Sequence, residues 1–343
     1  MNDADYELGR VLGGAVQEAR ERYERFGRQT VDLEYVAGEQ DECSPNRTTI
    51  ASPASVTGPG TFFGRAQRTL TFAPSVEPGW WIERQDLPDA LPIRVAIENV
   101  WTTGNIVSNI VLRSGSPHNY LRMVEHIIAL KIGMGLDDVV VRVDAGDPPL
   151  FESGSMDLVQ AVDAAGLTSG DQPADYVTVK EPVTLLGSRD SFVTLYPAAP
   201  GARTLTLDCA VDFPNAIGTQ RIRVEMGREA FRHGAIARTN TNLWRMLYCQ
   251  TIGKIFADIR NLGYSTGNLL IAGPRRYVNE PRLTHEGKSL EAVWHRAILD
   301  LMAAIALIRG RFAGHVVSYK AGHGLDCLLV TKLYQQKLLM PLK

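Results

Sequence analysis

Three histidines and two carboxylates in this sequence stand where they could do chemistry. "MVEHIIAL" places Glu125 and His126 side by side in an expected helix. "VWHRAILD" places His295 and Asp300 in a second expected helix, and "YKAGHGLD" places His323 in a glycine-flanked turn after an expected strand. Imidazole and carboxylate groups bind zinc and also act as general acids and bases. Such residues could together form a hydrolytic metal site.

The five-residue step from His295 to Asp300 argues against a shared ligand. At about 100° per residue, positions four apart lie roughly 40° apart around a helix, whereas positions five apart lie roughly 140° apart. A π-bulge, which absorbs one inserted residue and often occurs at functional sites, would return both side chains to one face. The alternative is a regular helix in which Arg296 and Asp300 form an i,i+4 ion pair and no zinc is bound.

Taken singly, the other residues also have plain structural interpretations. Glu125 and His126 could be a solvated glutamate and a half-exposed histidine, since the second histidine of an HExxH motif is absent and Ala129 stands there. His323 could cap a turn. Thr239, in "ARTNTN", could polarise a carbonyl, but a threonine at the entry of a helix is the simpler interpretation.

The composition is that of an ordinary globular protein. The chain has 343 residues, of which 45% are hydrophobic and 22% charged, and its formal net charge is −2. No global charge would attract nucleic acid or an anionic membrane. No apolar stretch approaches the ~18 residues of a membrane span. The four scattered cysteines lack CxxC spacing and predict reduced thiols in the cytoplasm, where no signal peptide is needed.

The order of expected elements predicts an α+β fold of two similar, duplicated sheet-plus-helix domains. Residues 46–172 and 173–343 each offer strand–turn–strand, helix, strand and helix in that order, with a polar linker within 167–175. Residues 1–45 are predicted to form a helical N-terminal appendage, with helical spacing from Leu8 onward. It could cover a surface, join a partner or mediate self-association.

Ordered motifs along the chain resemble a known enzyme family. "VTGPGTFFGRAQRTLTFAPS", "VEHIIALKIGMGLDDVVVRVDA", "DFPNAIGTQR", "ARTN", "AILDLMAAI" and "SYKAGHGLD" follow one another between about residues 46 and 336. Their order and spacing resemble the zinc-dependent UDP-3-O-acyl-N-acetylglucosamine deacetylases of lipid A biosynthesis. The resemblance implies two similar α+β domains with the active site between them.

The resemblance also assigns roles to the chemical residues. It implies zinc bound by His126, His295 and Asp300, a ligand set that leaves the open position that a hydrolytic zinc needs. Glu125 would be the general base toward water. His323, in its protonated form, would stabilise the oxyanion and donate a proton to the leaving amine. Because all these residues are present, we favour the π-bulge over the regular helix.

Further roles fall on residues around this set. The resemblance implies that Thr239 helps to hold the oxyanion, and that Arg296 and Lys320 contact the substrate. Phe62 stands where the family has a histidine in its glycine loop, and Asn240 stands where it has an aromatic residue. Both positions would lie near the sugar, so the substrate of this chain could differ in detail.

One departure bears on the acid histidine. The family places a second aspartate one turn after the ligand aspartate, but this chain has Ala304 there. We expect His323, without a carboxylate partner, to be less readily protonated, so that activity falls from about neutral pH upward.

The predicted function is that of a cytoplasmic zinc-dependent hydrolase that removes the N-acetyl group from an amino sugar. Its partner would be a small, nucleotide-linked substrate with a lipid-like acyl chain, with no nucleic acid and no membrane span. A first alternative is a catalytically inactive relative that binds a ligand or a protein without zinc. A second is a scaffold role carried by residues 1–45.

Overall fold

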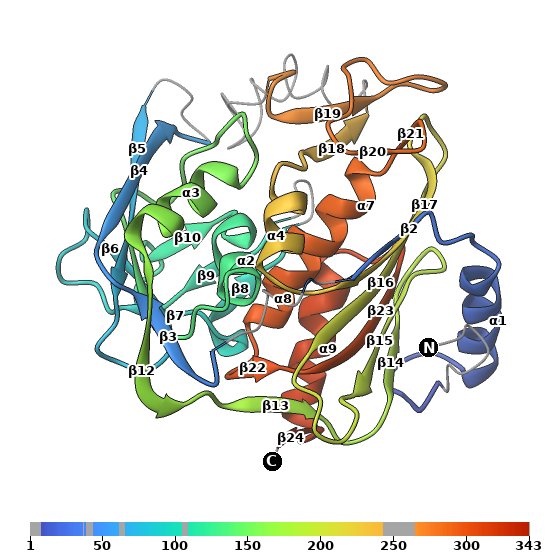
Figure 1. Ribbon diagram of the computed structural model, residues 1–343, viewed down its shortest axis with the longest axis horizontal. Helices are drawn as coiled ribbons and strands as arrows, with labels where there is room; N and C mark the ends of the chain where they lie inside the picture. Colours follow the sequence, from blue (N-terminus) through green and yellow to red (C-terminus); the bar gives the residue numbers. More distant parts are fainter. Residues whose placement is uncertain are drawn as a thin grey trace.

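The computed structural model shows a mixed α+β fold in which two sheets enclose a layer of helices (Figure 1). It describes residues 8–36, 38, 44–61, 66–104, 109–242 and 265–342. Within them, no helix is both long and apolar enough to cross a membrane.

The first sheet has five strands in the order β4-β5-β11-β6-β7. They are β4 (Ala54–Pro59), β5 (Gln67–Pro74), β11 (Val139–Val143), β6 (Trp80–Arg84) and β7 (Ile93–Arg94). The centre strand β11 runs antiparallel to β5 and parallel to β6. Helices α2 (Glu125–Gly133) and α3 (Met156–Ala165) lie on the side that faces the middle of the molecule (Figure 1).

The second sheet has seven strands in the order β1-β14-β15-β23-β16-β17-β2. They are β1 (Arg10–Val11), β14 (Val183–Leu186), β15 (Phe192–Pro197), β23 (Gly314–Tyr319), β16 (Leu205–Phe213), β17 (Gly218–Glu225) and β2 (Leu33–Tyr35). Its centre strand β23 runs antiparallel to β15 and parallel to β16. Helices α4 (Arg228–Ala235), α7 (Glu291–His295), α8 (Met302–Ala306) and α9 (His323–Gln335) cover its inner face (Figure 1).

Where the chain is described, the remaining elements form five small sheets and one short helical turn. They are η3 (Ile97–Asn99), β8 (Val100–Thr102), β9 (Val111–Arg113), β10 (Tyr120–Arg122), β3 (Asn46–Ile50), β12 (Leu167–Pro173), β13 (Tyr176–Val179), β22 (Arg311–Phe312), β24 (Leu339–Pro341), β18 (Thr239–Asn242), β19 (Leu269–Ala272), β20 (Thr284–His285) and β21 (Lys288–Ser289). The stretch 167–175, expected as a linker, is mostly strand β12, because its backbone pairs antiparallel with β3.

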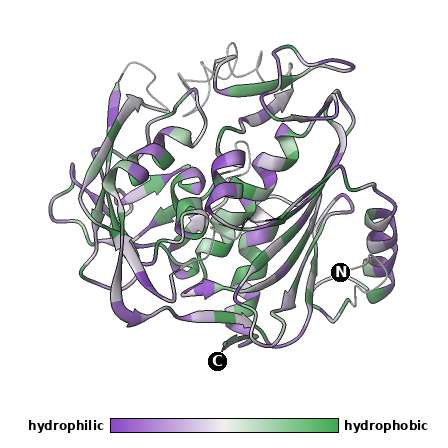
Figure 2. Ribbon diagram, viewed as in Figure 1, coloured by the Kyte–Doolittle hydropathy of each residue, from purple (hydrophilic) through white to green (hydrophobic). Residues whose placement is uncertain are grey.

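The hydrophobic core is continuous across both units. One cluster of buried side chains takes in Phe72 and Val141 of the first sheet, Leu207 of the second, and Ile128 and Met302 of the helices between them. Figure 2 shows this concentration of hydrophobic residues on the central helices, in contrast to the mostly hydrophilic outer helix α1 (Val16–Gly27). Helix α8 is buried along its whole length and α2 along most of it, which fixes the residues that they carry.

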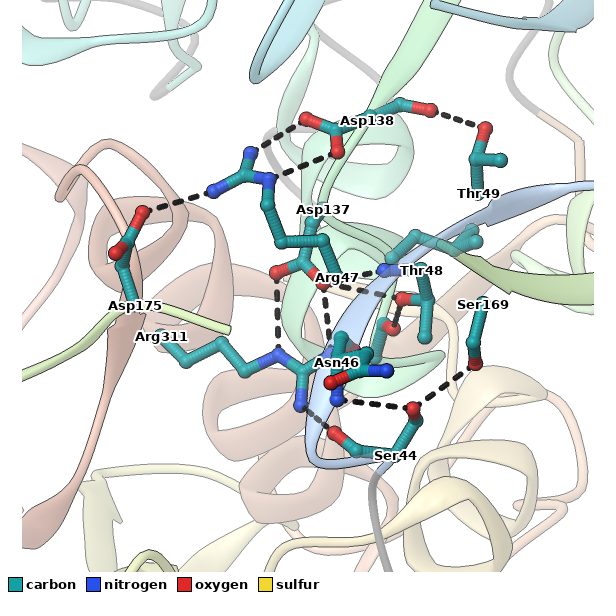
Figure 3. Close-up of polar contacts among 12 residues, drawn as sticks. Ser44, Asn46, Arg47, Thr48, Thr49, Asp137, Asp138, Ser169, Asp175 and Arg311 are labelled. Carbon is teal, nitrogen blue, oxygen red and sulfur yellow. Dashed lines mark hydrogen bonds and ion pairs between the residues drawn. The ribbon is translucent and has the colours of Figure 1, made fainter. Parts of the chain in front are cut away.

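Polar contacts also join the two units at one end of the helix layer (Figure 3). Arg311, the first residue of β22, binds Asp137 with an N–O distance of 2.7 Å, and Arg47 of β3 binds Asp138 at 2.9 Å and Asp175 at 2.9 Å. The Arg311–Asp137 pair is buried. Breaking one partner of such a pair is strongly destabilising, because the other charge stays buried, so this network fixes how the two units meet.

The N-terminal segment lies against the outer face of the second sheet. Helix α1 begins at Val16 rather than at Leu8, because residues 10–11 pair with β14 instead. Arg22 donates to the carbonyl oxygens of Gly187, at 2.7 Å, and of Ser191, at 2.5 Å. In residues 8–36, therefore, the expected appendage covers a surface of its own chain.

Candidate active site

A π-helical turn joins the chemical residues of the second half. Helix α7 ends at His295, the turn η4 (Arg296–Leu301) is π-helical, and α8 continues from Met302. This turn brings His295 Nδ1 to 3.4 Å from Asp300 Oδ1. The predicted bulge is confirmed, and the regular helix with an Arg296–Asp300 ion pair is wrong.

Packing explains why the helix keeps its extra residue. Trp294 precedes the turn, Ile298 and Leu299 lie within it, Met302 follows it, and all four are almost fully buried. A regular helix would rotate everything after the insertion by about 100° and turn one of these apolar stretches away from the core. The wider turn avoids this rotation, so core packing stabilises the geometry that aligns His295 with Asp300.

Glu125 and His126 enter the same cluster from the first half. They begin helix α2, and the ring centroids of His126 and His295 lie 5.3 Å apart. The Glu125 carboxylate is buried and accepts a hydrogen bond from the amide of Ile110 at 3.1 Å. His126 Nδ1 lies 3.1 Å from the hydroxyl of Ser155. Both halves therefore contribute to one cluster.

His323 has a carboxylate partner, contrary to the expectation drawn from Ala304. It is the first residue of α9, and its Nε2 atom lies 3.3 Å from Asp300 Oδ1. Ala304 is buried within α8 and supplies no charge. The expectation was wrong because one carboxylate, Asp300, meets both His295 and His323.

The surroundings separate the protonation states of these groups. Burial raises the pKa of Glu125 against the opposing charge of His323. Burial, followed by repulsion from His295, lowers the pKa of His126 to about 3, so its imidazole is neutral. Burial alone would lower the pKa of His323, but attraction to Asp300 and a hydrogen bond with it, followed by the charge of Glu125, raise that pKa to about 9. Burial opposes ionisation of Asp300, yet the two histidines that it contacts hold its pKa well below the usual value.

Thr239 contacts a histidine of the cluster. It begins strand β18, and its hydroxyl lies 2.9 Å from His295 Nε2. The preceding residue, Arg238, forms a buried ion pair with Glu291, the first residue of α7, at 2.7 Å. This pair ties the strand that carries Thr239 to the helix that carries His295.

Of the four residues expected to contact substrate, the structure describes three, and these three differ in their surroundings. Arg296 is buried and donates to Asp326 at 2.7 Å and to Ser318 at 3.0 Å, so its guanidinium has structural partners. Lys320 precedes α9 and donates to Asp212 at 3.2 Å. Asn240 follows Thr239 in β18. Phe62 lies outside the described residues.

Two residues near this cluster were missed by the sequence analysis. Asp326 accepts a hydrogen bond from Arg296 and lies three positions after His323. In "HGLD" this spacing places both residues on one face of a helix. Ser155 contacts His126 from a different helix, and no local pattern in the sequence signals that contact.

The donor set fits zinc in type, and one pair of its donors fits zinc in distance. Among the described residues, no three or more histidine, cysteine, aspartate or glutamate side chains are already arranged to hold a metal ion. However, two ligands at zinc bond lengths of about 2.0–2.1 Å in a tetrahedron lie about 3.4 Å apart. The 3.4 Å between His295 Nδ1 and Asp300 Oδ1 matches that separation. Two imidazoles and one carboxylate are the ligands of several hydrolytic zinc sites.

A pocket adjoins the cluster. His126 and Thr239 lie on its wall, and apolar side chains form much of the rest. These include Leu70, Leu150, Phe151, Leu158 and Leu269. A pocket with an apolar wall and a few polar groups at one end suits a ligand with a polar head and an apolar part.

Comparison with known proteins identifies the class to which this fold and site belong. The family described as UDP-3-O-acyl N-acetylglycosamine deacetylase matches residues 47–335, and the chain belongs to this family. Among similar proteins, the UDP-3-O-acyl-N-acetylglucosamine deacetylase of Syntrophus aciditrophicus is 28% identical over 290 residues, covering 84% of this chain and 86% of its own. The protein of the same name from Trichormus variabilis is 29% identical over 296 residues, covering 83% and 97%.

Proposed function

We propose that this chain is a zinc-dependent hydrolase that removes the N-acetyl group from UDP-3-O-acyl-N-acetylglucosamine, in lipid A biosynthesis. The observation that carries the proposal is the convergence of Glu125 and His126 on His295, Asp300 and His323, made possible by the π-helical turn. Family membership and the names of the similar proteins support the reaction and the substrate.

His126, His295 and Asp300 would hold the zinc ion. Bound there, zinc would supply Lewis-acid activation of water and of the amide carbonyl. The chain prepares its ligands, because burial keeps His126 neutral, with a lone pair to donate, and Asp300 is ionised. His295 and Asp300 now face each other, and a cation would replace the hydrogen bond between them.

Glu125 would act as the general base. Its buried carboxylate is oriented by the amide of Ile110, and its raised pKa makes it a better proton acceptor than an exposed glutamate. It would take one proton from the attacking water as the new C–O bond forms at the acetyl carbonyl. Adjacent positions on a helix diverge by about 100°, so Glu125 can serve the water while His126 serves the metal.

His323 would act as the general acid. In the metal-free chain, attraction to Asp300 raises its pKa to about 9, so it is protonated at neutral pH. In that form it would stabilise the oxyanion and then give its proton to the sugar nitrogen as the C–N bond breaks. Acetate and a free amine are the products. Thr239, whose hydroxyl now contacts His295, would add a hydrogen bond to the oxyanion.

The apolar pocket beside His126 would receive the acyl chain. Lys320 and Asn240 remain the candidate substrate contacts, together with Phe62, whereas the contacts of Arg296 favour a role in fixing α9. We further propose that the two units are duplicated domains, with boundaries at residues 46–172 and 173–343. The matching strand pairings around β11 and β23 support this, and the cytoplasmic location stays a prediction.

The test combines metal content with turnover. The purified protein should bind about one zinc per chain and release acetate from UDP-3-O-acyl-N-acetylglucosamine. Glu125→Gln should keep the zinc and lower kcat by on the order of 10²–10⁴. Glu98→Gln, which changes a carboxylate in a surface ion pair with Arg309, should leave both properties unchanged. A protein without zinc after reconstitution, and without turnover, would be the non-catalytic binding module instead.

A further inference from the structure

Ser155 departs from what a serine at its position usually does. It precedes the first turn of α3 as the N-cap residue, where a serine hydroxyl normally accepts a hydrogen bond from a backbone amide of that turn. Here the side chain makes no such capping bond. Its hydroxyl oxygen lies 3.1 Å from His126 Nδ1 instead, and the residue is fully buried.

Hydrogen bonds to two helices fix the backbone around Ser155. The Ser155 amide donates to the carbonyl of Ala235, at the end of α4, at 2.8 Å. The Ser155 carbonyl accepts bonds from the amides of Leu158 and Val159, at 3.1 Å each. The backbone that carries the hydroxyl is thus held by α3 and α4, and the hydroxyl is placed at hydrogen-bond distance from His126.

The hydrogen bond has a consequence for metal binding. A neutral imidazole carries one proton, so one ring nitrogen donates and the other keeps its lone pair. If Nε2 of His126 is to bind a cation, Nδ1 must carry the proton and needs an acceptor. Within the described part of the chain, the Ser155 hydroxyl is the acceptor at hydrogen-bond distance from Nδ1. A partner of this kind fixes both the tautomer and the orientation of a metal-binding histidine.

We infer that Ser155 is a positioning residue for the zinc site: its hydroxyl accepts the Nδ1 proton of His126 and directs Nε2 toward the metal. The inference rests on the proposed function, since it assigns His126 to zinc. It adds a residue that touches neither the metal nor the substrate.

The chain offers a matched control two residues earlier. The hydroxyl oxygen of Ser153 is also buried and has no hydrogen-bond partner among the residues that the structure describes. Ser153→Ala and Ser155→Ala therefore remove the same atom from the same loop. They differ because the Ser155 hydroxyl lies at hydrogen-bond distance from His126, whereas the Ser153 hydroxyl does not.

The experiment measures zinc affinity directly. Each full-length variant is stripped of metal and titrated with zinc in competition with a chromophoric chelator. Ser155→Ala should raise the Kd for zinc by about 10–100-fold, the usual effect of losing such a partner. Ser153→Ala should change it less than about 2-fold, and Ser155→Thr, which keeps a hydroxyl, should restore part of the affinity.

A second measurement needs no variant, so it holds even if Ser155→Ala fails to fold. In the zinc-loaded parent protein, ¹⁵N spectra of the His126 ring should show a protonated Nδ1 and a metal-bound Nε2. Zinc on Nδ1, or a Ser155→Ala variant that binds zinc as tightly as its parent, would overturn the inference and leave the proposed function standing. A parent protein that binds no zinc would overturn both.

Discussion

Deleting Ala297 should be tolerated, although it removes a residue from the middle of a buried helix. Ala297 lies within the π-helical turn, which holds one residue more than a regular helical turn would. Its deletion would restore four-residue spacing between His295 and Asp300 and return a regular helix. The side chains before and after the turn would still point in their present directions. The loss of unfolding free energy is therefore limited to one buried methyl group, about 1 kcal/mol, plus local repacking.

Deleting Ala303 from α8 is the matched control, because both alanines are fully buried. Within a regular helix, one deletion rotates all later residues by about 100° and moves them by about 1.5 Å. Ile305, Leu307 and Ile308 would then leave their places in the core. At about 2–5 kcal/mol for each misplaced side chain, the three together cost about 6–15 kcal/mol, which is comparable to the 5–15 kcal/mol that stabilises a typical domain.

The assay is urea unfolding followed by the fluorescence of the chain's tryptophans, combined with zinc stoichiometry. The Ala297 deletion should lose no more than about 2 kcal/mol of unfolding free energy and keep its zinc, whereas the Ala303 deletion should not fold. If both deletions unfold the protein alike, or if the Ala297 deletion folds but loses zinc, the π-helical turn does more than absorb one residue and our reasoning is refuted.

Three further predictions concern the charged groups. Asp300→Ala should reduce zinc from about one per chain to near zero, measured by metal analysis, because two remaining ligands hold zinc poorly. In the zinc-free protein, His323 should titrate by NMR with a pKa of about 9. Because this pKa is higher in the folded than in the unfolded chain, protonation of His323 stabilises the fold fully at a pH below the unfolded pKa. The stabilisation is lost as pH rises through about 9. A titration near 6.5 would show that Asp300 does not pair with it. Arg296→Met should cost about 3–5 kcal/mol in urea unfolding by leaving Asp326 buried and unpaired, while Arg296→Met with Asp326→Leu should recover most of this, and additive losses would contradict the pairing.

Local patterns in the sequence predicted the elements that carry the site. Alternation over residues 68–75 and 137–145 predicts β5 and β11, and helical periodicity over residues 155–166 and 324–336 predicts α3 and α9. Each element begins and ends within two residues of those bounds. Where a local pattern failed, a distant partner decided the structure. The pattern of "YLRMVEHIIALKIGMG", residues 120–135, predicts one helix, but residues 120–122 form β10, because their backbone pairs with β9.

The candidate site was predictable in its members but not in its contacts. The π-bulge followed from counting residues, because a one-residue surplus between two fixed motifs has few physical solutions. The partner of His323 was sought one turn along the helix from Asp300, at Ala304, whereas the structure places Asp300 itself against His323 from a separate element. Spacing along one helix reports neighbours on that helix, and a contact between α9 and η4 depends on how the whole helix layer packs.

The short strands β1 and β2 have a consequence for solubility. A sheet ends in strands whose free amide and carbonyl groups can recruit another chain, and short edge strands limit this. In the second sheet, β1 covers the outer side of β14 with two residues, and β2 covers the outer side of β17 with three. Both come from the same N-terminal segment. A chain shortened to begin after residue 36 would present the longer strands β14 and β17 as edges. We therefore expect residues 8–36 of the N-terminal appendage to limit aggregation, although the sequence suggested self-association as one of its roles.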